Sequence, residues 1–225
     1  MDLPRFTRLP KHIGVIPDGN RRWALRHGLP RESGYDYGIE PGFEMYELCR
    51  QLHIPELTLY GFTVDNTKRP AAQRRAFQAA CVESVRRIAE CDAALLVIGD
   101  SESPMFPAEL KPFTKRTTFG AGSIRVNFLV NYGWHWDLGH SLMRQPPAAK
   151  RHSPAQIMRS LASRDISRID LVIRWGGRRR LSGFLPAQSV YADFYTIDDL
   201  WPDFRPEHLY DALRWYEQQD VTLGG

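Results

Sequence analysis

The most unusual stretch of this sequence carries four arginines within seven positions, from 174 to 180. Arg174 closes an apolar segment, the pair Gly176-Gly177 follows, and Arg178, Arg179 and Arg180 lead towards Ser182. A guanidinium group is planar and can bind two phosphate oxygens at once, and glycines let the backbone bend round an anion. The run predicts a binding site for a phosphorylated ligand. Nucleic acid is the competing anion, because nearby tryptophans can stack on bases.

A second polar cluster lies near the start of the chain, in the run Pro17-Asp18-Gly19-Asn20-Arg21-Arg22-Trp23. Asp18 offers a carboxylate to Mg²⁺, and Gly19 lets backbone N–H groups approach a phosphate. Arg22 and Arg31 can clamp the remaining oxygens, so this set suits a metal diphosphate. Two simpler interpretations stay open. An Asp-Gly pair is also a common turn, and arginines can form a solvated basic face.

A third cluster runs from Thr63 to Pro70 and contains Asn66 and Arg69 as its polar candidates. The proline is typical of the first turn of a helix. Asp65 and Asn66 would also serve well as helix caps, which is the structural alternative to a role in binding.

The segments that must position these clusters alternate between β-rich runs and stretches of helical period. Several of the β-rich runs are apolar on both faces, as buried parallel strands are. We therefore predict an α/β fold with a central, mostly parallel sheet flanked by helices. Ligands of such sheets bind beyond the carboxyl ends of the strands, where all three clusters begin. The predicted strands are His12–Pro17, Leu57–Phe62, Ala94–Ile98, Ile124–Val130 and Leu171–Arg174, and the predicted helices contain Phe77, Cys81, Val85 and Ile88, and Leu209, Leu213 and Tyr216.

Composition limits the classes of protein that remain. A chain of 225 residues with a formal charge of +4 fits one domain, 1–225, and lacks a nucleic-acid module or a strong basic excess, so we expect no nucleic-acid partner. The three cysteines, Cys49, Cys81 and Cys91, argue against a disulfide framework or a zinc site and favour the cytoplasm. No apolar run is long enough to span a bilayer, so membrane contact should be peripheral at most. The segment from Gln145 to Pro154 is predicted to be an exposed connection.

Taken in order and with their spacing, these motifs resemble the cis-prenyltransferase (undecaprenyl diphosphate synthase) family. The family's opening motif contains Asp-Gly-Asn and Arg-Trp-Ala, as does the run from His12 to Ala24. The resemblance covers roughly residues 12 to 204. It continues through residues 28–31, 57–60, 66–70, 98–100, 131–133, 173–177, 191–193 and 200–204.

The resemblance implies a hydrophobic tunnel beside the sheet, a requirement for Mg²⁺ and a homodimer. It implies that an allylic diphosphate ionises and reacts with homoallylic isopentenyl diphosphate. Asp18 and Asn66 match catalytic positions, and Asp18 and Asp193 match metal ligands. The expected substrate-binding residues are Gly19, Asn20, Arg21, Arg22, Trp23, Arg31, Tyr35, Thr63, Arg69, Arg174, Arg178, Arg180 and Ser182.

Several positions depart from the family's pattern. On the side of the allylic substrate, Tyr35 replaces a histidine and Thr67 a tryptophan. On the side of the second substrate, Trp175 replaces a threonine, Arg178 an acid and Gly183 an asparagine. The family's arginine-glycine ending is also missing. These changes leave two alternatives to regular cis-elongation: an irregular, head-to-middle condensation of lavandulyl type, and a catalytically silent partner subunit.

We expect a short product. The region from Ser101 to Gly122 is predicted to form part of the tunnel, with bulky side chains as its floor. The same side chains would serve equally well as ordinary packing. The candidates are Met105, Phe106, Phe113 and Phe119.

Overall fold

The computed structural model describes residues 3–144 and 153–220. The predicted connection from Gln145 to Pro154 therefore lies, up to residue 152, outside the described residues. No helix within the described ranges is long and apolar enough to cross a membrane.

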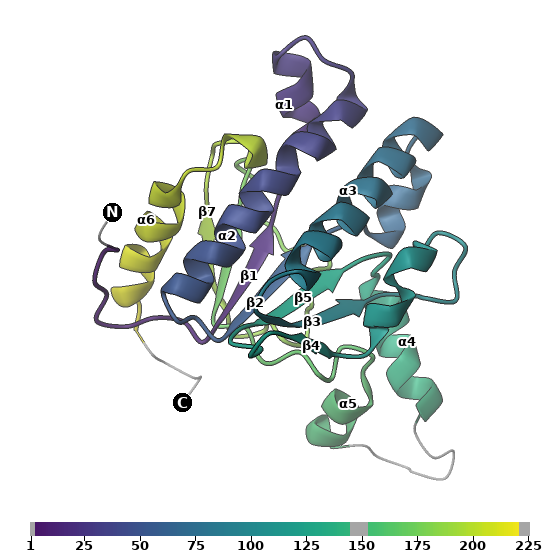
Figure 1. Ribbon diagram of the computed structural model, residues 1–225. Helices are drawn as coiled ribbons and strands as arrows, with labels where there is room; N and C mark the ends of the chain where they lie inside the picture. Colours follow the sequence, from purple (N-terminus) through teal and green to yellow (C-terminus); the bar gives the residue numbers. More distant parts are fainter. Residues whose placement is uncertain (1–2, 145–152, 221–225) are drawn as a thin grey trace.

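The described residues form one seven-stranded sheet in the order β4-β3-β5-β2-β1-β6-β7 (Figure 1). Every neighbouring pair is parallel except β3 and β4, which are antiparallel. The predicted fold class is thereby confirmed. The strands are β1 (His12–Ile16), β2 (Glu56–Tyr60), β3 (Ala93–Ile98), β4 (Thr117–Phe119), β5 (Arg125–Leu129), β6 (Leu171–Arg174) and β7 (Asp193–Thr196).

Helices cover the sheet because its strands alternate buried side chains between two faces. On β3, Val97 belongs to the same apolar cluster as residues of α2, α3 and α6, whereas Leu96 and Ile98 belong to a second apolar cluster on the other face. The helices are α1 (Asn20–Arg26), α2 (Ile39–Gln51), α3 (Ala71–Ala89), α4 (Trp134–Arg144), α5 (Pro154–Ser160) and α6 (Pro206–Glu217); short 3-10 helices are η1 (Arg31–Gly38), η2 (Val64–Lys68), η3 (Ala108–Thr114) and η4 (Trp201–Asp203).

The apolar stripe predicted between residues 77 and 88 holds α3 against the sheet. Cys81, Val85 and Ile88 recur at helical spacing, and all three are buried. Burial of side chains of this size contributes roughly 1.5–3 kcal/mol each. The stripe thus fixes α3 beside α2 over the middle of the sheet (Figure 1).

A polar cluster lies towards the amino ends of the strands, and we call it the amino-end network: the buried His12, Glu56, Thr58 and Asn127 with the exposed Ser167. Asn127 Nδ2 donates to Glu56 Oε1 and to Thr58 Oγ1, both at 2.8 Å, and the Ser167 hydroxyl donates to Glu56 Oε2. His12 Nε2 lies 2.8 Å from Thr58 Oγ1, and its Nδ1 lies 3.1 Å from the Ser167 carbonyl oxygen. A neutral imidazole satisfies both contacts, because Nδ1–H donates and Nε2 accepts.

Candidate active site

The three polar clusters meet at the carboxyl end of the sheet, as predicted. Ile16, the last residue of β1, pairs with Arg174, the last residue of β6, so the loops that follow these strands are neighbours. Together with the segment after β2, they enclose an open cleft of about 610 Å³. It is lined by the predicted residues Asp18, Gly19, Asn20, Arg21, Arg22, Arg31, Tyr35, Thr63, Asn66, Arg69, Arg174, Arg178, Arg180 and Ser182.

Asp18 and Arg174 form the ion pair at the centre of this cleft. Arg174 Nη2 lies 2.8 Å from Asp18 Oδ2, and the Arg174 side chain is only 5% exposed against 32% for Asp18. The other Arg174 nitrogen, Nη1, donates to the Ser182 hydroxyl at 2.9 Å and to the Arg180 carbonyl oxygen. Arg174 therefore acts as a buried anchor that holds the loop after β6 against the loop after β1.

Glycines allow these two loops to approach closely. Gly176 and Gly177 follow β6 with φ of 82° and 69°, a left-handed conformation that side chains disfavour. Arg22 Nη2 donates to the Gly176 carbonyl oxygen at 3.0 Å, and a Cβ at Gly176 would lie 2.3 Å from this nitrogen. The same guanidinium also reaches Asp18 Oδ1 at 3.4 Å. A side chain at position 176 would thus force Arg22 out of its place.

The cleft carries far more positive than negative charge. Seven arginines line it, against the carboxylates of Asp18 and Asp65. Within the described residues, Arg31, Arg178 and Arg180 have no carboxylate within ion-pair distance. Guanidinium groups that the fold leaves without anions, facing an open cleft, are suited to bind phosphate groups.

Tyr35 lies between this cleft and the apolar interior. Its hydroxyl accepts a hydrogen bond from Arg69 Nη1 at 2.6 Å, and its ring stacks on Phe77 with centroids 4.4 Å apart and planes 6° apart. Burial raises the pKa of Tyr35, and nearby Arg69 and Arg21 only partly oppose this effect. The hydroxyl is therefore neutral near pH 7 and retains its own proton for donation.

Asn66 performs the capping role that the sequence offered as the structural alternative. The Thr63 backbone N–H donates to Asn66 Oδ1 at 3.1 Å, within a capping box at the start of η2. This contact fixes the orientation of the amide and leaves its NH₂ group as the donor that Asn66 can offer to the cleft. The cap and the cleft position are thus compatible.

Two predicted site residues do not line the cleft. Trp23 Nε1 donates to Asp203 Oδ1 at 2.7 Å, and the indole stacks on His27. Asp193 pairs with Leu171 at the start of β6, whereas the cleft lies beyond Arg174 at its end. Three residues of strand separate the two ends by about 10 Å. Asp193 therefore lies at the opposite end of β6 from Asp18 and does not line the cleft, so among the described residues only Asp18 of the two predicted metal-binding carboxylates faces it.

Trp175 was also expected to alter the side of the second substrate, and the structure corrects this interpretation. Trp175 is fully buried and packs edge-on against Trp201 with ring centroids 4.8 Å apart. Successive residues of an extended chain point to opposite faces, so Trp175 enters the core where Arg174 enters the cleft.

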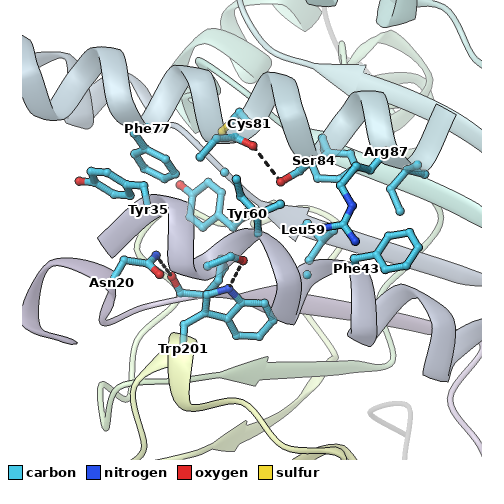
Figure 2. A pocket seen from close by; sticks show the side chains of 18 residues that line it. Asn20, Tyr35, Phe43, Leu59, Tyr60, Phe77, Cys81, Ser84, Arg87 and Trp201 are labelled. Carbon is cyan, nitrogen blue, oxygen red and sulfur yellow. Dashed lines mark hydrogen bonds between the residues drawn. The ribbon is translucent and has the colours of Figure 1, made fainter. Parts of the chain in front are cut away.

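An apolar pocket of about 60 Å³ adjoins the cleft between α2 and α3 (Figure 2). Pro17, Asn20, Tyr35, Tyr60 and Phe77 line both cavities, so one leads into the other. Further lining residues that the sequence analysis missed as a site include Phe43, Leu59, Cys81, Ser84 and Arg87. The lining residues from α3 lie on the same helix face as the predicted apolar stripe, so the stripe was the sequence signal from which this pocket could have been predicted.

The four side chains predicted as the floor of the tunnel, Met105, Phe106, Phe113 and Phe119, do not line this pocket. Phe106 is buried in the main core, and the other three pack against that core. These contacts are those of the packing alternative that the sequence left open.

The donor set fits Mg²⁺ that arrives with a phosphorylated ligand. Among the described residues there is no group of three or more side chains able to hold a metal ion alone. Mg²⁺ usually keeps several waters and binds through one or two carboxylates plus substrate phosphates. The partly exposed carboxylate of Asp18, among phosphate-binding arginines, meets that requirement.

Comparisons with known proteins agree with the geometry. The prenyltransferase family model described as undecaprenyl diphosphate synthase matches residues 16–224. An isoprenyl transferase of Nitrosomonas europaea is 34% identical, over 99% of this chain and 88% of that protein. A ditrans,polycis-undecaprenyl-diphosphate synthase of Pseudomonas syringae, specific for (2E,6E)-farnesyl diphosphate, is 33% identical, over 97% of this chain and 92% of that protein.

The fold recurs in a solved structure. Lavandulyl diphosphate synthase from Lavandula x intermedia, in complex with dimethylallyl diphosphate, superposes with a TM-score of 0.81 over 96% of this chain and 98% of that chain. Its identity is 23%, so this likeness concerns the fold alone. The match of the family model and the identity to the bacterial enzymes show that the chain is a prenyltransferase and belongs to the undecaprenyl diphosphate synthase family.

Proposed function

We propose that this enzyme condenses an allylic diphosphate with isopentenyl diphosphate by cis-elongation and releases diphosphate, forming a short product. The observation that carries the proposal is the junction of two cavities. A cleft lined by seven arginines and Asp18 opens directly into an apolar pocket beside Tyr35 and Phe77. Such a junction suits a ligand with a charged diphosphate head and a hydrocarbon tail.

The cleft offers two separate sets of donors, one for each diphosphate. Asn20, Arg22, Arg31 and Gly19, on and near α1, suit the allylic diphosphate, because Asn20 lines both cavities and the other three line the cleft. The loop after β6 suits the second diphosphate, through Arg174, Arg178, Arg180 and Ser182. Asp18 lies between the two sets, paired to Arg174 and Arg22.

Magnesium, when bound by Asp18 together with the substrate phosphates, would neutralise charge on the departing diphosphate. The arginines of the allylic set add hydrogen bonds to the same oxygens, so leaving-group charge is stabilised as it develops. Tyr35 can donate its hydroxyl proton to these oxygens while Arg69 holds the hydroxyl in place.

The hydrocarbon part of the substrate needs a different environment. Phe77 and Tyr35 present stacked aromatic faces where the cleft becomes apolar, and the pocket beyond them excludes water from the allylic cation. Asn66 offers its NH₂ group, which favours a role in positioning a diphosphate over a role as proton acceptor.

An irregular, head-to-middle condensation is the second candidate. The observation that favours it is Arg178, which lines the second half of the cleft where the family usually has an acid. A silent partner subunit is disfavoured, because Asp18, Arg174 and the arginines of both sets all line one cleft.

Product analysis tests the proposal. The purified protein with Mg²⁺ would be incubated with dimethylallyl, geranyl or farnesyl diphosphate, each with and without isopentenyl diphosphate, and the products identified by mass spectrometry and NMR. We expect Z-configured linear products that require isopentenyl diphosphate. Branched or cyclic products formed without it would establish the irregular reaction, and absence of turnover with every pair would indicate the silent subunit.

We further propose that the enzyme works as a homodimer in the cytoplasm. Apolar side chains on α4 and α5 support a subunit contact, because Leu142 and Met143 are 74% and 79% exposed and Ile157 is 39% exposed. The three cysteines are free, in keeping with a reducing compartment. Light scattering of the wild type and of a Leu142→Glu/Met143→Glu variant would test the dimer, and an unchanged mass would exclude this surface.

A further inference from the structure

The apolar pocket has a defined inner end, on the side away from the cleft. Phe77 lines both cavities, whereas Arg87, ten residues further along α3, lines only the pocket. At 1.5 Å per residue these positions lie roughly 15 Å apart along the helix. Figure 2 shows Arg87 and Phe43 on the opposite side of the pocket from Tyr35 and Asn20.

A charged side chain closes this end. The Arg87 guanidinium carbon lies 4.2 Å from the centre of the Phe43 ring, and Arg87 Nη1 donates to Glu40 Oε2 at 2.8 Å. Phe43 and Glu40 belong to α2, so Arg87 joins α3 to α2 across the gap between the two helices. We call these three residues the α2–α3 clamp.

We propose that the α2–α3 clamp sets the length of the product by blocking the inner end of the apolar pocket. The inference rests on the proposed function, since the pocket must hold the growing hydrocarbon tail. Each round of elongation forms one carbon–carbon bond and releases a diphosphate and a proton, and it pushes the tail one unit further from the cleft. A tail that reached Arg87 would have to break the contact of this cation with the Phe43 ring, which is unfavourable.

The dimensions support a short tail. The pocket measures about 60 Å³, against roughly 300–1,000 Å³ for a typical pocket that encloses a drug-sized ligand. A longer chain therefore has to separate α2 from α3 or leave the pocket at its end, and the clamp opposes both movements.

The three members of the clamp contribute unequally. The Arg87 and Glu40 side chains are 31% and 70% exposed, and an ion pair so open to water adds little. The contact of Arg87 with the Phe43 ring lies against the pocket itself, so it forms the main barrier. Removal of Arg87 or Phe43 should therefore change the product more than neutralisation of Glu40.

Product length in four variants tests the clamp. With allylic diphosphate and excess isopentenyl diphosphate, Arg87→Ala and Phe43→Ala should each lengthen the main product by at least one five-carbon unit. Glu40→Gln should broaden the distribution only slightly. Arg86→Ala is the matched control, because the neighbouring Arg86 is exposed and does not line the pocket, so its products should equal those of the wild type. Unchanged products in both Arg87→Ala and Phe43→Ala would overturn the proposal.

A binding measurement keeps the clamp testable even if the wild type makes no such product. Calorimetry with n-alkyl diphosphates of increasing length should show affinity rising about fourfold per buried methylene until the tail meets the clamp. In Arg87→Ala the rise in affinity should continue to a longer alkyl chain than in the wild type. Phe43→Ala replaces this variant if Arg87→Ala does not fold. If affinity stops rising at the same alkyl length in the wild type and the variants, the clamp is contradicted. If that length shifts but the wild type shows no turnover, only the proposed function is contradicted.

Discussion

Two polar clusters occupy opposite ends of the same sheet, and they differ in how completely the protein satisfies them. In the amino-end network, the carboxylate of Glu56 is 3% exposed and accepts hydrogen bonds from Asn127 and Ser167. In the cleft, the carboxylate of Asp18 is 32% exposed, and the guanidinium groups of Arg31 and Arg178 have no anionic partner among the described residues. One cluster is closed by the protein itself, and the other is left open.

The difference separates structure from function. Buried polar groups must find partners, and a network that finds them all stabilises and specifies the fold. Cations that gather without anions repel one another, so a fold keeps them together where a ligand supplies the missing charge. Substitutions at the two ends should therefore affect different quantities.

The largest expected effect is on stability, at the amino end. Glu56→Ala removes the acceptor of Asn127 and Ser167 and the ion-pair partner of Arg125. Each buried donor left without its acceptor costs about 1–3 kcal/mol. Urea denaturation measures this loss. At low temperature, the rate of turnover per folded molecule should stay near that of the wild type. A large fall in this rate with unchanged stability would refute the contrast between the amino-end network and the cleft.

Asp18→Ala should produce the opposite pattern. Loss of the proposed metal ligand should lower kcat about 10²–10³-fold, since removal of one electrostatic stabiliser of a transition state has effects of this size. The substitution also leaves the buried Arg174 without its carboxylate partner, so the thermal midpoint should fall as well, but the rate per folded molecule should fall far more. Initial rates and a thermal melt provide the two readouts. Substantial residual activity would defeat the metal role.

A sharper test divides the cleft itself. Arg31→Ala should raise KM for the allylic diphosphate about tenfold, and Arg178→Ala should raise KM for isopentenyl diphosphate by a similar factor, as expected for one lost charged hydrogen bond. Each variant should leave the other KM nearly unchanged. Arg179→Ala is the control, because Arg179 is exposed and absent from the lining of the cleft. Equal effects of Arg31→Ala and Arg178→Ala on both KM values would remove the proposed division.

The smallest expected effect is a pH dependence of stability at the amino end. Burial alone raises the pKa of Glu56, but His12, the hydrogen bonds from Ser167 and Asn127 and the charge of Arg125 outweigh it, so the pKa falls below 4.5. Burial lowers the pKa of His12 below 6.5. In both cases the unfolded chain binds more protons, so stability falls as pH decreases.

Unfolding free energies measured between pH 7 and pH 3 check this dependence. The His12 contribution should weaken below pH 6.5 and the Glu56 contribution below pH 4.5, each by at most about 1.4 kcal/mol per pH unit. Glu56→Gln should flatten only the more acidic part of the curve. A curve unchanged by that substitution would show that Glu56 is not held ionised.

Much of the cleft could be predicted because its residues follow apolar strands in the sequence. The runs that became β1, β2 and β6 are rich in apolar residues and buried along their whole length, and parallel strands bring the loops that follow them to one edge. The three-residue β4 and the β7 strand were missed. Both are short edge strands, and neither has the continuous apolar run of a central strand.

The errors share a physical cause, which is that sequence spacing does not specify on which side a residue lies. Trp175 follows Arg174 directly but enters the core because side chains alternate. Asp193 was placed by motif, yet the register of β7 puts it at the start of β6. Phe113 and Phe119 are bulky and apolar, as a tunnel floor would be, but bulk alone does not place a side chain: their ring centroids lie 6.2 Å apart, and neither residue lines the apolar pocket.

Titration of the wild type with inorganic pyrophosphate, with and without Mg²⁺, tests the central claim most directly. We predict that pyrophosphate binds, that Mg²⁺ tightens binding, and that Asp18→Ala abolishes the Mg²⁺ effect while Glu56→Gln leaves it intact. Absence of binding to the folded wild type, or a Mg²⁺ effect that survives in Asp18→Ala, would contradict the assignment of the open cluster to diphosphate.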